Sequence, residues 1–219
     1  MSPVTEAMGS AWSIAASLFA FLAYEVYVGF RARHDPDGVA RSAHASIRVM
    51  WVRALSRQPG SEILAVQTLR NSLMSATIVA STAALALMGS VSLGSALFEH
   101  PHDTLQAFGM NELLMLLLMT TLFASLVASA LAMRLFNHAG FIVSMPVGSP
   151  ERAALEPVAE AYLRRAGQHY SRGLRGLFMV APMLAGLVWP LLMPLGTAGL
   201  LIALSLFDRA PARARAADR

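Results

Sequence analysis

Four long apolar stretches, at residues 11–30, 73–97, 113–135 and 177–207, constrain the fold of this chain most strongly. A helix needs roughly 20 apolar residues to cross about 30 Å of hydrocarbon, and each stretch is long enough. The chain of 219 residues is 56% hydrophobic and only 14% charged, which is too apolar for a soluble domain. The sequence therefore predicts one all-α domain, a polytopic membrane protein with a four-transmembrane-helix bundle.

The fourth stretch is the longest and carries the strongest helix breakers. Its prolines and glycines are Pro182, Gly186, Pro190, Pro194 and Gly196. Proline removes a backbone donor, so a helix here is kinked or broken and needs neighbours to satisfy the freed carbonyls. We expect a single span that is kinked or partly broken, and a re-entrant hairpin is the alternative.

Arginines are sorted sharply between the loops. There are none before the first stretch, seven at residues 31–70, none at 98–111, six at 134–175 and four after residue 207. By the positive-inside rule the two arginine-rich loops are cytoplasmic, which places both termini outside. The expected location is a bacterial inner (plasma) membrane, with residues 208–219 as a flexible arginine-rich tail.

Both cytoplasmic loops contain amphipathic helical patterns. In the first loop, apolar residues recur at helical spacing from Ala43 to Leu55 while arginines occupy other faces. In the second, Ser149 followed by Pro150 is typical of a helix start, and an apolar stripe follows from Leu155 to Ala166. We expect two interfacial helices at the membrane surface.

Polar residues from all four stretches fall near one predicted depth, at the cytoplasmic end. This candidate layer contains Tyr24, Glu25, Gln67, Arg70, Asn71, Arg134, Asn137, His138 and Arg175. An ionised carboxylate inside an apolar run is costly unless it is paired, so an arginine such as Arg70 or Arg175 should reach Glu25. The layer is either a set of structural ion pairs with snorkelling arginines, or a vestibule for an anion, a phosphate-bearing molecule or a lipid headgroup.

Catalytic and cofactor signals are weak. The chain has no cysteine, and no nucleotide-binding loop or nucleophile elbow is present. We therefore predict no catalytic residue, no metal site and no cofactor. Two weaker alternatives are a metal site in the outer loop, from Glu99, His100, His102 and Asp103, and a haem held by His138 and His169.

The expected partners follow from charge and from small residues. Topology explains the arginines, so anionic lipid headgroups are expected partners and nucleic acid is not. Small residues at every fourth position allow close helix packing, either within one protomer or in a homo-oligomer. These stripes are Ser72, Ala76, Ala80 and Ala84, and then Ala124, Ala128 and Ala132.

Several runs resemble one family of bacterial and plant membrane proteins, the domain of unknown function 599 family. They are Tyr24-Glu25-Val26-Tyr27 with Arg31 and Arg33, Trp51-Val52, the run from Ile63 to Ser72 containing Gln67-Thr68-Leu69-Arg70-Asn71, and Gly173-Leu174-Arg175-Gly176-Leu177 with Pro182, Trp189 and Pro190. The resemblance covers nearly the whole chain. It implies an integral membrane protein with four spans and no established activity.

Three functions remain open at this point. The favoured hypothesis is a small oligomeric channel or carrier for anions or small polar solutes, with the polar layer along its path. The alternative is an accessory or scaffold protein that binds a membrane complex or lipid through its cytoplasmic helices. A haem- or metal-binding membrane protein comes third.

Overall fold

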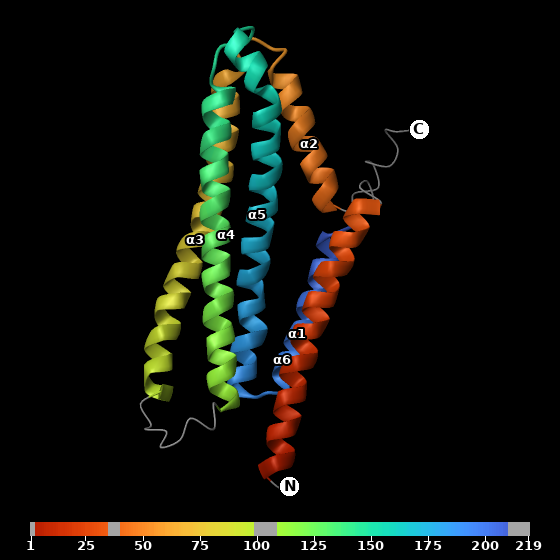
Figure 1. Ribbon diagram of the computed structural model, residues 1–219, viewed down its shortest axis with the longest axis vertical. Coiled ribbons are helices and arrows are strands. Elements are labelled where there is room, and N and C mark those ends of the chain that lie inside the picture. Colours follow the sequence, from red (N-terminus) through yellow and green to blue (C-terminus); the bar gives the residue numbers. More distant parts are fainter. Residues whose placement is uncertain (1–2, 35–39, 99–108, 210–219) are drawn as a thin grey trace.

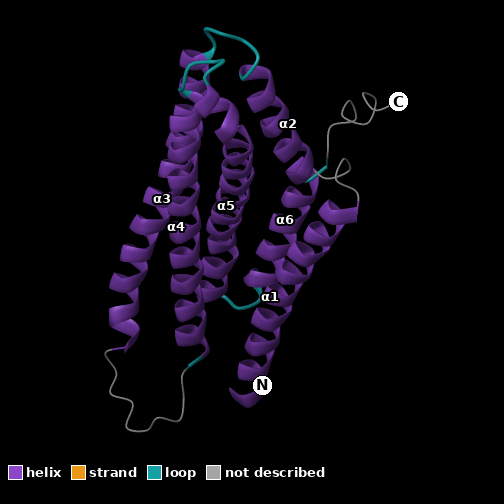
Figure 2. Cartoon of the chain, turned by 45° about the horizontal axis from the view of Figure 1, so that its top comes forward, coloured by secondary structure: helices purple, strands orange, loops and turns teal. Residues whose placement is uncertain are grey.

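The fold is entirely helical in the part of the chain that the structure describes, residues 3–34, 40–98 and 109–209 of a computed structural model (Figure 1, Figure 2). These residues form six helices. They are α1 (Pro3–His34), α2 (Ala40–Leu55), α3 (Glu62–Phe98), α4 (Met110–Val143), α5 (Pro150–Val188) and α6 (Leu192–Phe207).

The helices form two groups side by side. Helices α3, α4 and α5 are long and run next to one another, with α4 packed against both of the others (Figure 1). Helices α1 and α6 form a pair on the other side of α5, beside its C-terminal half, and α2 runs beside its N-terminal half. Helix α5 therefore packs against α4, and it also packs against α2 through its N-terminal half and against α6 through its C-terminal half.

Two apolar cores are stacked along the molecule, one at each end of α5. The first lies between α2, α3, α4 and the N-terminal half of α5, and it includes Val52, Leu69, Phe136 and Leu163. The second lies between α1, α4, α6 and the C-terminal half of α5, and it includes Ile14, Leu118, Leu122, Met179, Met183 and Met193. The change of partner along α5 falls between the two cores.

The fourth apolar stretch is a helical hairpin rather than one kinked helix. Helix α5 ends at Val188, and Trp189 is extended with φ −151° and ψ 117°. Pro190 explains this break, because a residue before proline is pushed out of the helical region and proline has no N–H to continue the ladder. Helix α6 then starts at Leu192 and runs back along α5. The expected single span is thus replaced by the hairpin alternative.

The hairpin also corrects the expected position of the C-terminal segment. The end of α6 lies beside the C-terminal half of α1, so the N-terminal end of α1 and the end of α6 are at opposite ends of this pair (Figure 1). Asp208, which we assigned to a flexible tail, is instead bound within the helical core. Residues 210–219 of the predicted tail lie outside the described residues.

Three helical segments are long and apolar enough to cross a bilayer. They are Ala11–Ala32, Glu62–Gly94 and Met110–Val143, and Leu192–Phe207 is a shorter apolar helix. Their outer faces expose large apolar side chains such as Trp12, Phe19 and Ile78, a pattern that water would penalise and lipid would not. Three such helices indicate a multi-pass membrane protein.

Of the two amphipathic loop segments, one forms the separate helix α2 and the other forms the first part of α5. Helix α5 begins at Pro150 with Ser149 as its N-cap, as the sequence predicts, and the Ser149 hydroxyl accepts a hydrogen bond from the Arg152 N–H at 3.3 Å. It continues without interruption into the fourth apolar stretch. Helix α2 packs against α5 through Val52 and Leu55, while Ile47 and Met50 on its predicted apolar stripe are exposed.

Candidate functional site

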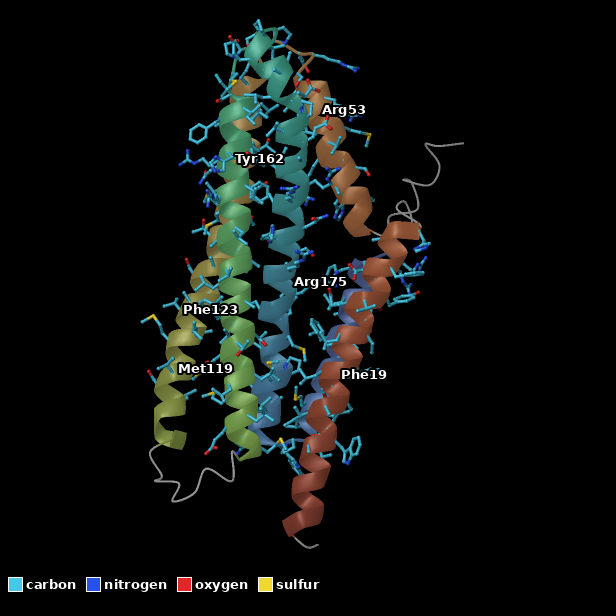
Figure 3. The ribbon with its side chains drawn as sticks, viewed as in Figure 1. Phe19, Arg53, Met119, Phe123, Tyr162 and Arg175 are labelled. Atoms are coloured by element: carbon cyan, nitrogen blue, oxygen red, sulfur yellow. The ribbon has the colours of Figure 1, made fainter. Side chains whose placement is uncertain are left out.

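A cluster of four polar side chains joins α1, α5 and α6 between the two apolar cores. We call it the Arg175 cluster; it consists of Tyr24, Glu25, Arg175 and Asp208. Arg175 Nη1 donates to Glu25 Oε1 at 2.6 Å, and its Nη2 donates to Asp208 Oδ1. The Tyr24 hydroxyl donates to Asp208 Oδ2 at 2.7 Å. Figure 3 places Arg175 where α5 passes the α1–α6 pair.

The cluster lies where α1, α5 and α6 meet. Arg175 follows a glycine-containing segment of α5 that lies tightly on α4, and only 7% of the residue is exposed. Asp208 is the C-cap of α6, so the returning helix carries it back to the depth of Glu25. The Asp208 backbone carbonyl also accepts from the Ala40 N–H at 3.0 Å, at the start of α2. Asp208 therefore connects α6 to α1, α5 and α2.

Beside the cluster lies a cleft of about 970 Å³ between α2, α5 and the ends of α1 and α6. We call it the basic cleft. Its lining contains five arginines and a single carboxylate, that of Asp208, among the described residues. The arginines are Arg48, Arg53, Arg164, Arg172 and Arg175.

Two of the five arginines are already engaged by carboxylates. Arg175 is held in its cluster, and Arg53 forms a bidentate pair with Glu160 at 2.7 and 3.1 Å. No carboxylate in residues 3–34, 40–98 and 109–209 lies within ion-pair distance of Arg48, Arg164 or Arg172. The cleft thus presents a surplus of positive charge.

Arg48 lies directly over Gly167, so its position depends on that glycine. A Cβ atom at residue 167 would meet the Arg48 guanidinium at 2.2 Å from Nη1. Burial lowers the pKa of Arg48, because removing a cation from water disfavours the charged form. An anion in the cleft would compensate for that lost hydration.

The remaining residues of the predicted polar layer are not near this site. Gln67, Arg70 and Asn71 are exposed on α3, which lies on the far side of α4 and α5 from α1 (Figure 1). Arg134, Asn137 and His138 are exposed on α4, and the His138 ring lies 5.8 Å from that of Tyr162. The structure therefore brings Tyr24, Glu25 and Arg175 together and leaves the other six apart from them.

Four residues of the site were not predicted from the sequence: Arg48, Arg164, Gly167 and Asp208. Asp208 had a usable signal, an acid directly after an apolar run and before an arginine-rich tail. The weaker alternative of an outer metal site, with Glu99, His100, His102 and Asp103, lies outside the described residues. Among residues 3–34, 40–98 and 109–209, no group of three histidine or acidic side chains is arranged to hold a metal ion.

Comparison with known proteins gives one family. The family model described as protein of unknown function, DUF599, matches residues 12–212. The chain belongs to this family. No curated protein and no solved structure matches it. The matched residues include both apolar cores and the basic cleft, and the family description assigns them no activity.

Proposed function

We propose that this DUF599 protein binds a phosphate-bearing anion in the basic cleft and acts as an anion carrier or channel in the membrane. The observation that carries the proposal is the set of three cleft arginines, Arg48, Arg164 and Arg172, with no carboxylate partner in the described chain. Guanidinium groups form bidentate hydrogen bonds with phosphate oxygens, and such charge-assisted bonds are among the strongest that side chains make.

The volume of the cleft supports an organic anion rather than a bare halide. Pockets for small molecules usually enclose roughly 300 to 1,000 Å³, and the basic cleft has about 970 Å³. A halide would leave most of this space to water. The channel or carrier hypothesis now rests on the cleft, because Gln67, Arg70 and Asn71 lie on the far side of the bundle.

From the positive-inside rule, we expect the cleft to lie on the cytoplasmic side. The cleft is built from the two arginine-rich segments, and such segments remain in the cytoplasm. The site would then meet anions from the cytoplasm at the end of the predicted spans. In this arrangement Arg175 and Asp208 line the cleft near the ends of α1 and α6.

Binding is tested with the full-length protein in mild detergent, using glycerol 3-phosphate and inorganic phosphate as probes in calorimetry. We expect binding that weakens in the Arg48→Gln/Arg172→Gln double variant and is unchanged in Arg57→Gln. Arg57 is a matched control, because it is exposed between α2 and α3 and does not line the cleft. A folded wild-type sample that binds neither probe, and no anionic lipid, would refute the proposal.

Transport is tested separately by flux into liposomes. We expect the wild-type protein to move an organic phosphate or another small anion across the bilayer, and the Arg48→Gln/Arg172→Gln variant to move it more slowly. Native mass spectrometry of the same sample gives the oligomeric state, which the favoured hypothesis expects to exceed one. Binding without flux would leave an anion-binding protein and remove the carrier function.

The second candidate function is an accessory or scaffold protein. Exposed Ile47 and Met50 on α2, next to basic residues, favour it, because an apolar strip with a charged border is typical of a docking surface. Cross-linking through Ile47→Cys in cells should then give one stoichiometric partner, and Leu64→Cys on exposed α3 is the control. For the haem alternative, a purified sample without visible absorbance would count against it.

A further inference from the structure

The basic cleft has two chemically different ends. Because α5 rises about 1.5 Å per residue, Arg164 and Phe178 are separated by roughly 20 Å along its axis, and both line the cleft. One end of the cleft is the end closer to Pro150, where α5 begins. It is lined by Arg48, Arg53 and Arg164. The opposite end is lined by Gly29, Ala32, Leu174, Phe178, Leu204 and Phe207.

Part of the apolar end belongs to the first candidate span and to the apolar helix α6. Gly29 and Ala32 belong to the last turns of the candidate span Ala11–Ala32, and Phe207 ends the apolar helix α6. Phe178 is 43% exposed and Phe207 76% exposed, and a Cβ atom at Gly29 would meet nothing within 4 Å. The cleft is therefore open beside Gly29, near the end of the first candidate span.

A water-soluble phosphate uses only half of such a site. It would pair with the arginines, but it has no apolar part to cover the phenylalanine rings that line the other end of the cleft. A molecule with a phosphate headgroup and an acyl chain would satisfy both ends. Its headgroup charge would match the surplus arginines, and its chain would cover Phe178 and Phe207.

We propose that the ligand of the basic cleft is an anionic phospholipid, with its phosphate at Arg48, Arg164 and Arg172 and an acyl chain along Phe178 and Phe207. This inference rests on the anion site of the proposed function, and it names the class of ligand. A phosphate monoester carries about two negative charges near pH 7. It therefore matches three arginines better than a diester, which carries one.

The test uses the delipidated full-length protein and native mass spectrometry with three probes. They are phosphatidic acid, phosphatidylcholine with the same acyl chains, and glycerol 3-phosphate, which has the headgroup without the chains. We expect phosphatidic acid to bind roughly ten-fold or more tightly than either of the others. This factor corresponds to one additional charge-assisted hydrogen bond or one covered aromatic side chain.

Two variants separate the ends of the site. Arg172→Gln alters an exposed residue and should weaken phosphatidic acid and glycerol 3-phosphate alike, by roughly ten-fold. Phe178→Ala should weaken phosphatidic acid only. Arg57→Gln and Phe141→Ala are the matched controls, since both residues are exposed away from the cleft and should change neither.

Each other outcome is decisive. Equal binding of glycerol 3-phosphate and phosphatidic acid overturns the lipid inference and leaves the proposed anion site intact. If phosphatidic acid and phosphatidylcholine are retained equally and Arg172→Gln has no effect, the bound lipid is unspecific annular lipid. This result also overturns the lipid inference. Binding of none of the probes by a folded sample overturns both the inference and the proposed function.

Discussion

The Tyr24 hydroxyl donates a hydrogen bond to Asp208 at 2.7 Å across 184 positions of the chain. This contact links the first apolar stretch to the end of the last one. It requires the chain to turn back after Val188, because a single fourth span would carry Asp208 to the opposite end of α1. The same carboxylate binds Arg175, so the contact also fixes the boundary between the α1–α6 pair and the basic cleft.

Arg175→Ala should be the most destabilising arginine substitution in this region. Arg175 is 7% exposed and binds both Glu25 and Asp208, so its removal breaks two ion pairs from one side. Breaking a buried ion pair from one side costs about 3–5 kcal/mol. We expect a lower melting temperature and lower accumulation in the membrane.

Arg70→Ala is the control for this variant, because Arg70 is exposed on α3. It should behave like wild type within about 0.5 kcal/mol. If the two variants were equally stable, Arg175 would not be the residue that neutralises Glu25. Arg175→Lys should be intermediate, since lysine keeps the charge but cannot present two fixed donors to two acids.

Tyr24→Phe and Asp208→Asn should be coupled in a double-mutant cycle. Tyr24→Phe removes one hydrogen bond to a carboxylate, which contributes about 1.5–3 kcal/mol. In the Asp208→Asn background the acceptor is neutral, so the same change should cost less, and the coupling energy should be about 1 kcal/mol. The free energy of unfolding in detergent is the measured quantity, and additive effects would contradict the hydrogen bond.

Much of the fold could be predicted, because the length of an apolar run and the residues that cap a helix can both be recognised within a short stretch of sequence. The first three apolar stretches lie within α1, α3 and α4, and Ser149 with Pro150 marks the start of α5. An arginine partner for Glu25 could also be predicted, since a carboxylate at that depth requires a cation. Arg175, one of the two arginines named as examples, makes the contact.

The rest could not be predicted because it depends on which helices are neighbours. Depth along a helix does not say which helices face one another, so Gln67, Arg70 and Asn71 were grouped with Glu25 although α3 lies beyond α4 and α5. A proline within an apolar run allows either a kink or a reversal of the chain. The helical periodicity of the apolar residues is the same in both cases, so it cannot distinguish them. The reversal at Pro190 is what moved Asp208 into the cluster.

Gly173→Ala should destabilise the contact between α4 and α5. A Cβ atom at residue 173 would lie 2.4 Å from Ser129 Oγ and 3.1 Å from the Ser125 carbonyl oxygen. The hydroxyl can rotate away, but the backbone oxygen cannot, so the helices must separate at a cost of about 1–3 kcal/mol.

Gly89→Ala on α3 is the matched control for Gly173→Ala. A Cβ atom there would meet nothing within 4 Å, so only the gain in helix propensity remains. We expect a stability equal to wild type or higher by up to about 1 kcal/mol. Thermal unfolding of both variants in the same detergent gives the comparison, and a stable Gly173→Ala protein would mean that α5 does not approach α4 this closely.

Single cysteines should place Arg209 and Arg57 on the same side of the membrane. The chain contains no cysteine, so each introduced thiol reports one position without a background. Gly9, Arg57 and Arg209 are exposed at the start of α1, between α2 and α3, and after α6. If the α5–α6 hairpin returns α6 to the arginine-rich end, a membrane-impermeant maleimide added to intact cells should label Gly9→Cys and spare the other two. Labelling of Arg209→Cys together with Gly9→Cys would restore a single fourth span, and it would separate Asp208 from Tyr24 in the membrane.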